Sequence, residues 1–319
     1  MQSFESLLKE FNQQFDRSHF PATPASLYEP NNYFLKLGGK RVRPVLCLMG
    51  NELFEEINSS SWKAATAIEL FHNFTLIHDD IMDKAPLRRG QQTVHAKYGE
   101  STALLAGDVM LIRAYDHINS VDPTHLQLVL SLFNKTAREV CEGQQLDMDF
   151  EKRESVGIDE YLHMIELKTS VLLAASLQMG AIIGGAGERN QHLLYEFGRK
   201  LGLAFQVQDD YLDAFGDPEK FGKQVGGDIM ANKKTFLLIH ALENTSRKGE
   251  LNDLLAGNAS DKVDKVLAIY RDCKADAWAL ELKNKYLGEA LEHLDSIAVL
   301  SARKEPLKQL AHYLINRDI

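Results

Sequence analysis

Residues 61–83 read SWKAATAIELFHNFTLIHDDIMD. Apolar residues recur at intervals of three and four from Ala64 to Ile81, which places them on one face of a helix. Serines at 59–61 supply residue types that start helices. The pattern ends in the acidic segment DDIMD, residues 79–83, where neighbouring like charges require a neutralising partner. This stretch therefore predicts a helix that buries one face and carries a polar site at its C-terminal end.

Helical spacing is common elsewhere in the chain, whereas the apolar–polar alternation of strands is scarce. Most of the 8 prolines fall at apparent breaks, including Pro30 and Pro306. We therefore predict an all-α protein. The segments with the clearest helical spacing, besides the first, are 101–119, 125–146 and 189–215.

The Pro- and Gly-containing stretches 19–32 and 216–228 are predicted to be loops, and neither is a long polar linker. A single domain over residues 1–319 is therefore expected. The most apolar stretch, 169–187, carries Gln178 at its centre and many small residues, which favours a buried core helix over a membrane span.

The bulk numbers restrict the function. A net charge of −9 argues against nucleic acid as the main partner. Three cysteines without a CxxC pair argue against a disulfide framework or a zinc site and favour a reducing compartment. The N-terminus lacks the basic start and apolar core of a secretory signal, so a cytoplasmic location is expected.

The acidic segment has an echo further along the chain. DDYLD, residues 209–213, again follows an apolar helical pattern, and no repeat array accompanies it. Positions i and i+4 share a helix face, so Asp79 lies beside Asp83, and the first and last aspartates of the second segment lie together likewise. A single such pair is usually a solvated surface, but two in matching contexts favour a paired site.

Carboxylate oxygens suit Mg²⁺, which keeps several waters and typically joins one or two carboxylates to substrate phosphates. Two such helix ends facing across a cavity would hold Mg²⁺ ions with a diphosphate between them. The metal would then neutralise the charge that develops on a leaving diphosphate.

Basic residues near the acidic segments indicate a second, metal-free phosphate site. Arg88 and Arg89 follow the first segment in a loop opened by Pro86, and arginine binds phosphate through its planar fork. Lys168 and Thr169 are expected at the N-terminus of the apolar helix, where backbone N–H groups attract anions. Further candidates lie in two glycine-containing segments. GGKRVRP contains Lys40, Arg41 and Arg43. FGKQVGGDIMANKK contains Lys223, Lys233 and Lys234, and this second segment is a candidate lid over the phosphates.

Taken together, these motifs resemble the trans-isoprenyl diphosphate synthases of the polyprenyl synthetase family. Each is weak alone, but their order and combination are specific and cover most of the chain. The matching segments are GGKRVRP (38–44), ELFHNFTLIHDDIMDKAPLRRG (69–90), LKTS (167–170), FQVQDDYLD (205–213) and the loop 222–235.

The resemblance implies helices around a deep central cavity (the isoprenoid synthase fold), usually a homodimer, and Mg²⁺ as cofactor. It also implies a reaction. An allylic diphosphate ionises, isopentenyl diphosphate attacks the carbocation head to tail, and loss of a proton gives a trans product that is longer by one C5 unit. The departing diphosphate is the expected base.

The resemblance further assigns roles to individual residues. Direct metal ligands would be Asp79, Asp83 and Asp209, supported by Asp80, Asp210 and Asp213. The allylic diphosphate would be held by Arg88, Lys168, Gln206 and Lys223, and phosphates also by Lys233 in the lid. Isopentenyl diphosphate would be held by Lys40, Arg43, His72 and Arg89. Oxygen dipoles near the developing cation would come from Thr169 and Gln206.

Product length is expected to depend on side chains before the first acidic segment. Phe74 and Thr75 lie five and four residues before Asp79, and Phe71 lies one further turn back. In the family, large aromatics here stop elongation early. One aromatic with an uninserted DDxxD resembles archaeal-type geranylgeranyl synthases, which favours a twenty-carbon product, with farnesyl diphosphate as the alternative.

Other readings account for less of the sequence. A terpene cyclase usually carries an NSE-type second metal motif and has no need for GGKRVRP. A metal phosphohydrolase built on His78 and Asp79 would leave the second DDxxD unexplained. A non-catalytic synthase subunit typically loses one or both acidic motifs, and both are complete here.

Overall fold

The computed structural model describes residues 1–16, 18–217, 225–257 and 259–315. The structure is 77% helical with almost no strands, which confirms the all-α prediction. Among them, the only sheet is a small antiparallel hairpin in which β1 (Leu87–Arg88) pairs with β2 (Gln91–Gln92). Of the two arginines expected in a loop, Arg88 therefore ends β1 and Arg89 begins the turn of this hairpin.

The chain divides into two compact units. Unit 1 comprises Met1–Phe133 and Ser176–Gln191, and unit 2 comprises Asn134–Ala175 and His192–Ile319. Each unit contains one of the two acidic segments. A single domain over the whole chain remains a prediction.

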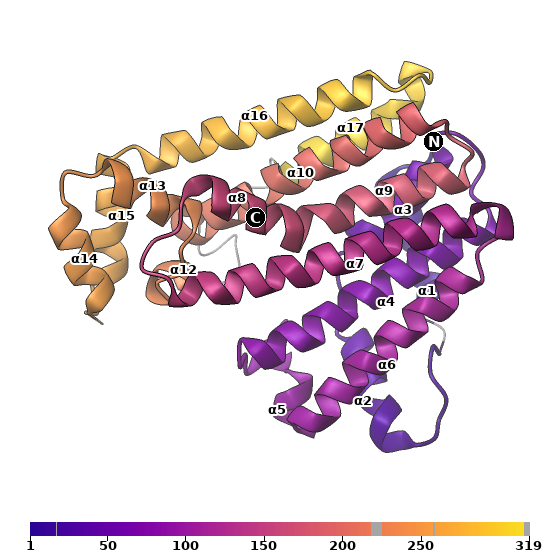
Figure 1. Ribbon diagram of the computed structural model, residues 1–319, viewed down its shortest axis with the longest axis horizontal. Helices are drawn as coiled ribbons and strands as arrows, with labels where there is room; N and C mark the ends of the chain where they lie inside the picture. Colours follow the sequence, from indigo (N-terminus) through magenta and orange to yellow (C-terminus); the bar gives the residue numbers. More distant parts are fainter. Residues whose placement is uncertain (17, 218–224, 258, 316–319) are drawn as a thin grey trace. The chain divides into compact units, whose positions relative to one another are not determined.

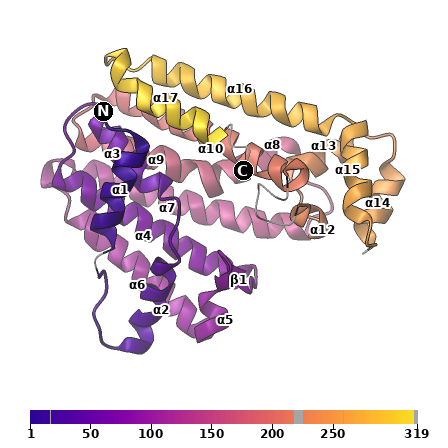
Figure 2. The ribbon, with the colours of Figure 1, turned by 180° about the vertical axis from the view of Figure 1, so that it is seen from behind.

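In unit 1, the central helix is α4, which packs along α6 and α3 (Figure 1 and Figure 2). Around this core, α2 and α5 pack against α6, and α1 packs against α3. The helices that lie wholly in unit 1 are α1 (Phe4–Phe15), α2 (Ala25–Lys36), α3 (Val42–Glu52), α4 (Ser59–Met82), α5 (Val94–Tyr98) and α6 (Glu100–Asn119).

In unit 2, α16 packs against α17, α13 and α15, as Figure 1 shows at its orange and yellow end. Three long helices, α7 (Pro123–Lys152), α9 (Val171–Ile183) and α10 (Glu188–Phe215), contain the unit boundaries. The other elements of unit 2 are α8 (Ile158–Ile165), the π-helix η1 (Glu166–Ser170), α12 (Gly227–Met230), α13 (Phe236–Asn244), α14 (Lys248–Ala256), α15 (Lys262–Asp272), α16 (Ala275–Asp295) and α17 (Ser301–Ile315).

Hydrogen bonds at both ends of α4 define where this helix begins and where it ends. At the start, Asn58 and Ser61 form a reciprocal capping box, so the true N-cap lies one residue before the predicted serines. At the end, Lys84 has a left-handed backbone (φ 51°), Ala85 N–H donates to Asp80 O at 3.0 Å, and Lys84 N–H donates to Ile81 O at 3.2 Å. These two hydrogen bonds form a Schellman motif, a common way for an α-helix to end. The helix therefore ends at the acidic segment.

Two expectations about helix boundaries were wrong. The predicted loop 19–32 contains the first two thirds of α2, with Pro30 inside the helix, and Pro306 likewise lies inside α17. Each proline removes only one backbone donor, a cost that tertiary packing can offset. Leu307 and Phe34, which follow these prolines, are fully buried.

The apolar segment is a core helix, as predicted. Ile158–Ile183 is long and apolar enough to cross a membrane, but 78% of its most apolar window is buried inside the protein. Ala174, Leu177 and Met179 have no exposed surface. Burial against other helices therefore accounts for its composition.

Candidate active site

The first acidic segment has one buried carboxylate and two accessible ones. Asp80 is only 1% exposed, whereas Asp79 is half-buried and Asp83 is exposed. Arg88 Nε lies 2.9 Å from both Asp80 carboxylate oxygens, and Arg88 Nη2 lies 2.7 Å from one of them. Arg88, expected to hold a diphosphate, is therefore paired with Asp80, the middle aspartate of the segment. The outer two aspartates are more accessible to solvent.

A basic cluster lies in the same unit, at the start of α3 and along α4. Arg43 Nη1 donates to His72 Nε2 at 3.1 Å. Burial and the positive charge of Arg43 hold the pKa of His72 well below its usual value, so the imidazole is neutral. Because Arg43 can only donate, the proton of His72 sits on Nδ1. Arg89 belongs to this group, because its charge also lowers the pKa of His72. Its guanidinium lies 3.1 Å from where a Cβ on Gly39 would stand.

Arg41 belongs to a different environment from its neighbours in GGKRVRP. It is 6% exposed, forms an ion pair with the buried Glu69, and lies 4.7 Å from the Phe15 ring centroid. Asn73 also donates to Glu69 Oε1 at 2.8 Å. The grouping of Arg41 with the phosphate-binding candidates was therefore wrong, because its guanidinium is committed to the core, whereas Lys40 is exposed.

The second acidic segment, on α10, repeats the arrangement of the first with different donors. Asp210 is 4% exposed, accepts a hydrogen bond from the Tyr161 hydroxyl, and accepts another from Gln206 Nε2 at 2.9 Å. Burial raises the pKa of Asp210 to about 7, although Lys233 and these two donors oppose the shift. Thr169 Oγ1 donates to Gln206 Oε1 at 3.2 Å, so Thr169, Gln206, Asp210 and Tyr161 form one network.

Asp209 and Asp213 are half-buried. Asp213 accepts the backbone N–H of Asp228 at 2.9 Å, which ties the second acidic segment to α12. Lys234 donates to Phe150 O at 2.8 Å at the end of α7. The structure thus commits Lys234 to a backbone carbonyl, Lys233 is exposed, and Lys223 lies outside the described residues.

Lys168 and Thr169 do not begin a helix. They lie in η1, within the continuous helical run Ile158–Ile183, so the expected anion site at a helix N-terminus is wrong. Their backbone N–H groups belong to the interior of that run, and such π turns within α-helices are frequent at functional sites. Lys168 Nζ lies 2.5 Å from Asp147 Oδ2.

Two glycines pack against the π turn. A Cβ on Gly143 of α7 would stand 2.4 Å from Lys168 N, and one on Gly202 of α10 would stand 2.7 Å from Ser170 Cα. Both distances are shorter than real contacts, so only glycine permits this close approach of helix backbones. The π turn is therefore held from two sides.

The predicted length-determining residues are close together on α4. Phe71 is 1% exposed and Phe74 is 9% exposed, with ring centroids 5.6 Å apart. Thr75 is half-buried and donates to His72 O at 2.8 Å. Phe74 is thus the phenylalanine nearest to the acidic segment along α4, and Thr75 uses its hydroxyl within the helix.

Tyr161 and Asp147 were not found from the sequence. Tyr161 is 49 residues away from its partner Asp210, and Asp147 is 21 residues away from Lys168. No local spacing rule links residues so far apart. The one available signal for Asp147 was its position four residues after Gly143 on a helical pattern, which puts both on the face that meets η1.

The donor set of both acidic segments consists of carboxylate oxygens, which fits a hard divalent cation. Across the described part of the chain, no three His, Cys, Asp or Glu side chains are close enough to hold a metal by themselves. Mg²⁺ keeps waters and commonly takes further ligands from substrate phosphates, so accessible carboxylate pairs are compatible with it. The residues therefore fit a metal that binds together with a diphosphate.

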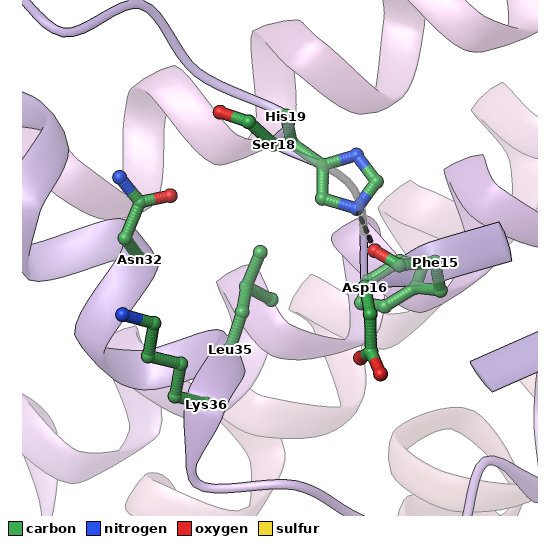
Figure 3. Close-up of a pocket in the computed structure, with 7 residues that line it drawn as sticks. All are labelled: Phe15, Asp16, Ser18, His19, Asn32, Leu35 and Lys36. Carbon is green, nitrogen blue, oxygen red and sulfur yellow. Dashed lines mark hydrogen bonds between the residues drawn. The ribbon is translucent and has the colours of Figure 1, made fainter. Parts of the chain in front are cut away.

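A cavity of about 300 Å³ opens elsewhere in unit 1, between the end of α1 and α2 (Figure 3). His19 Nε2 hydrogen-bonds Phe15 O at 2.7 Å, and Lys36 and Asn32 extend from α2. None of the predicted site residues lines this cavity. The lining residues are Phe15, Asp16, Ser18, His19, Asn32, Leu35 and Lys36.

An all-α chain with an aspartate-rich DDxxD segment on each of two helices defines the class of proteins with the isoprenoid synthase fold. Residues 24–273 match the family model described as Polyprenyl synthetase. The chain belongs to the polyprenyl synthetase family, whose members generally depend on divalent metal ions.

Individual relatives agree with this assignment. The chain is 40% identical to a geranylgeranyl diphosphate synthase of Methanosarcina mazei, over 92% of this chain and 91% of the relative. A crystal structure of a geranylgeranyl pyrophosphate synthase is 43% identical and superposes with a TM-score of 0.95 over 99% of both chains. The geranylgeranyl pyrophosphate synthetase of Pyrococcus horikoshii is 34% identical, with a TM-score of 0.92 over 98% of this chain and 99% of that one.

Proposed function

We propose that the protein is a short-chain trans-prenyltransferase that condenses isopentenyl diphosphate head to tail with an allylic diphosphate and releases diphosphate. The observation that carries this proposal is shared by both acidic segments. In each, the middle aspartate is buried and held by protein donors, while the flanking aspartates remain more accessible. Family membership and the names of the relatives support the same reaction.

Asp79, Asp83 and Asp209 are proposed as Mg²⁺ ligands, with Asp80, Asp210 and Asp213 in supporting positions. Bound Mg²⁺ supplies electrostatic stabilisation of the leaving diphosphate. The protein's own contribution is orientation, because Arg88 fixes Asp80 and Tyr161 fixes Asp210. Asp213 accepts a backbone N–H and so also connects its helix to the segment that carries Lys233.

Isopentenyl diphosphate is proposed to bind at the basic cluster of unit 1, formed by Lys40, Arg43, His72 and Arg89. Arginine and lysine hold this diphosphate without a metal, so its C–O bond is not activated. Neutral His72 retains its Nδ1–H as a donor, while Nε2 is satisfied by Arg43. The cluster therefore fits a diphosphate that must stay attached.

The allylic diphosphate is proposed to bind Arg88, Lys168, Lys223 and Lys233, with Gln206 beside them. The Lys168–Asp147 pair orients the ammonium before substrate arrives. Thr169 and Gln206 are linked through their side chains, so their oxygen dipoles are held in place near the proposed cation.

Geranylgeranyl diphosphate is the proposed main product, and farnesyl diphosphate is the alternative. The named synthases among the similar proteins support the twenty-carbon product. Because Phe74 is the phenylalanine nearest to the acidic segment along α4, we expect it to limit the growing chain.

Phe74→Ala is expected to lengthen the product distribution, because it removes a ring between the acidic segment and the buried Phe71. Reversed-phase chromatography of dephosphorylated products measures the change. Phe197→Ala, which removes a fully buried ring on α10, is the control for general loosening of the core. An unchanged chain length in Phe74→Ala would show that this residue does not form the floor.

Tyr161→Phe is expected to raise the Mg²⁺ concentration needed for half-maximal rate by about 10- to 100-fold, the usual effect of losing a group that orients a metal ligand. The substitution removes only the hydroxyl that donates to Asp210. Rate is measured against Mg²⁺ at saturating substrates, with Tyr286→Phe as the matched buried control on α16. Equal Mg²⁺ dependence of the two variants would contradict the role of Tyr161.

A homodimer is also proposed. Leu104, Leu105 and Ile112 on α6 are 50%, 56% and 60% exposed, which is unusual for large apolar side chains on one helix. Light scattering coupled to size-exclusion chromatography tests the assembly. A cytoplasmic location is proposed because all three cysteines are free thiols.

The decisive experiment incubates purified protein with Mg²⁺, labelled isopentenyl diphosphate and, in turn, dimethylallyl, geranyl or farnesyl diphosphate. An elongated trans-prenyl diphosphate and released diphosphate are expected. Release of a hydrocarbon would identify a terpene cyclase, release of phosphate would identify a phosphohydrolase, and no product from any primer would point to a non-catalytic subunit.

A further inference from the structure

A ladder of aromatic rings runs through unit 1, starting at the residue before Asp79. Each ring contacts the next at a distance typical of favourable aromatic pairs. The centroid distances are 4.7 Å for His78–Phe74, 5.6 Å for Phe74–Phe71, 5.3 Å for Phe71–Phe133 and 5.1 Å for Phe133–Tyr115.

The first ring of this ladder is confined on the side away from Phe74. His78 Nε2 hydrogen-bonds Leu104 O at 3.1 Å and lies 3.8 Å from Asp108 Oδ1. A Cβ added to Gly107 would stand only 2.2 Å from His78 Nε2 and 2.4 Å from its Cδ2. The imidazole therefore occupies the space that any other residue at position 107 would fill.

The second ring depends on the first. Phe74 meets His78 at an interplanar angle of 66°, an edge-to-face contact, and Phe71 at 52°. Both neighbours are on α4, one turn either side of Phe74, so its ring is held between them. Of these two neighbours, Phe71 is buried. The position of His78 depends instead on how its ring fits against Gly107 of α6.

We propose that His78 is a positioning residue for product length: wedged against Gly107, its ring fixes the Phe74 ring in the orientation that ends chain growth. Gly107 is a glycine because this wedge leaves no room for a side chain. The inference rests on the proposed function, and it adds two residues that do not touch the growing chain themselves.

The test compares products of the intact enzyme with Mg²⁺, isopentenyl diphosphate and farnesyl diphosphate. His78→Ala is expected to raise the ratio of twenty-five- to twenty-carbon product about three- to tenfold, the range expected from losing one edge-to-face ring contact. His78→Phe, which keeps a ring against Phe74, should stay near the original ratio. His78→Asn keeps a polar group but no ring, and should behave like the alanine variant.

Gly107→Ala tests the wedge independently, because its methyl group must displace the imidazole. It is expected to change the product ratio in the original background and to have no further effect in a His78→Ala background, where the space is free. Gly288→Ala is the matched control, since a Cβ there meets nothing within 4 Å. Circular dichroism establishes that each variant is folded, and the His78 series decides the matter if Gly107→Ala does not fold.

The outcomes separate this inference from the function on which it rests. If Phe74→Ala lengthens the product while His78→Ala leaves the ratio unchanged, the positioning role is wrong and the proposed function stands. If His78→Asn matches the original enzyme, hydrogen bonding and not the ring is responsible, which also overturns the wedge. If the unmodified enzyme makes no elongated product, the proposed function itself fails.

Discussion

Asp79→Asn is expected to reduce the rate of prenyl transfer by about 1,000-fold, because metal stabilisation of a leaving group contributes several kcal/mol and each 1.36 kcal/mol is tenfold in rate. Asp79 stands one helical turn before Asp83, and both are more accessible than the paired Asp80. Turnover of labelled isopentenyl diphosphate at saturating substrates measures the loss.

The control for this prediction is Asp253→Asn, which removes an exposed carboxylate on α14. It should leave the rate unchanged, and thermal unfolding should show both variants folded. Retention of more than about a tenth of the original rate in Asp79→Asn would remove this carboxylate from the proposed metal site, since a direct ligand is worth more than one factor of ten.

Arg41→Met is expected to lower the free energy of unfolding by about 3–5 kcal/mol, because it leaves Glu69 buried without its cation. Arg41 is 6% exposed and Glu69 is 2% exposed. The remaining hydrogen bond from Asn73 is neutral and cannot balance a buried charge. Denaturant unfolding measures the difference.

A matched ion pair on the surface gives the contrast. Lys265→Met breaks the Lys265–Asp261 pair, whose side chains are 49% and 52% exposed, and should leave the free energy of unfolding almost unchanged, because solvent screens such a pair. The double variant Arg41→Met with Glu69→Leu should recover part of the loss, because neither charge is then left unpaired. Equal stability of the two single variants would contradict the structural role of Arg41.

Some errors of prediction have a common cause. Arg41 and Lys234 are basic residues beside an anion-binding motif, and sequence could not distinguish a side chain that meets a substrate from one that meets the protein. In the structure they meet Glu69 and a backbone carbonyl. Those partners lie elsewhere in the chain, so only tertiary packing reveals them.

Sequence alone was sufficient to predict the helical class, the helix α4 and the two acidic segments. Each of these predictions depends on periodicity and spacing within about 25 residues, where the geometry of a helix is regular. Tertiary structure was needed for the continuous helix through Lys168 with its π turn, for the hold of Tyr161 on Asp210, and for the fit of His78 against Gly107. These depend on contacts between separate helices, and no rule of local spacing encodes which backbone comes close enough to exclude a Cβ.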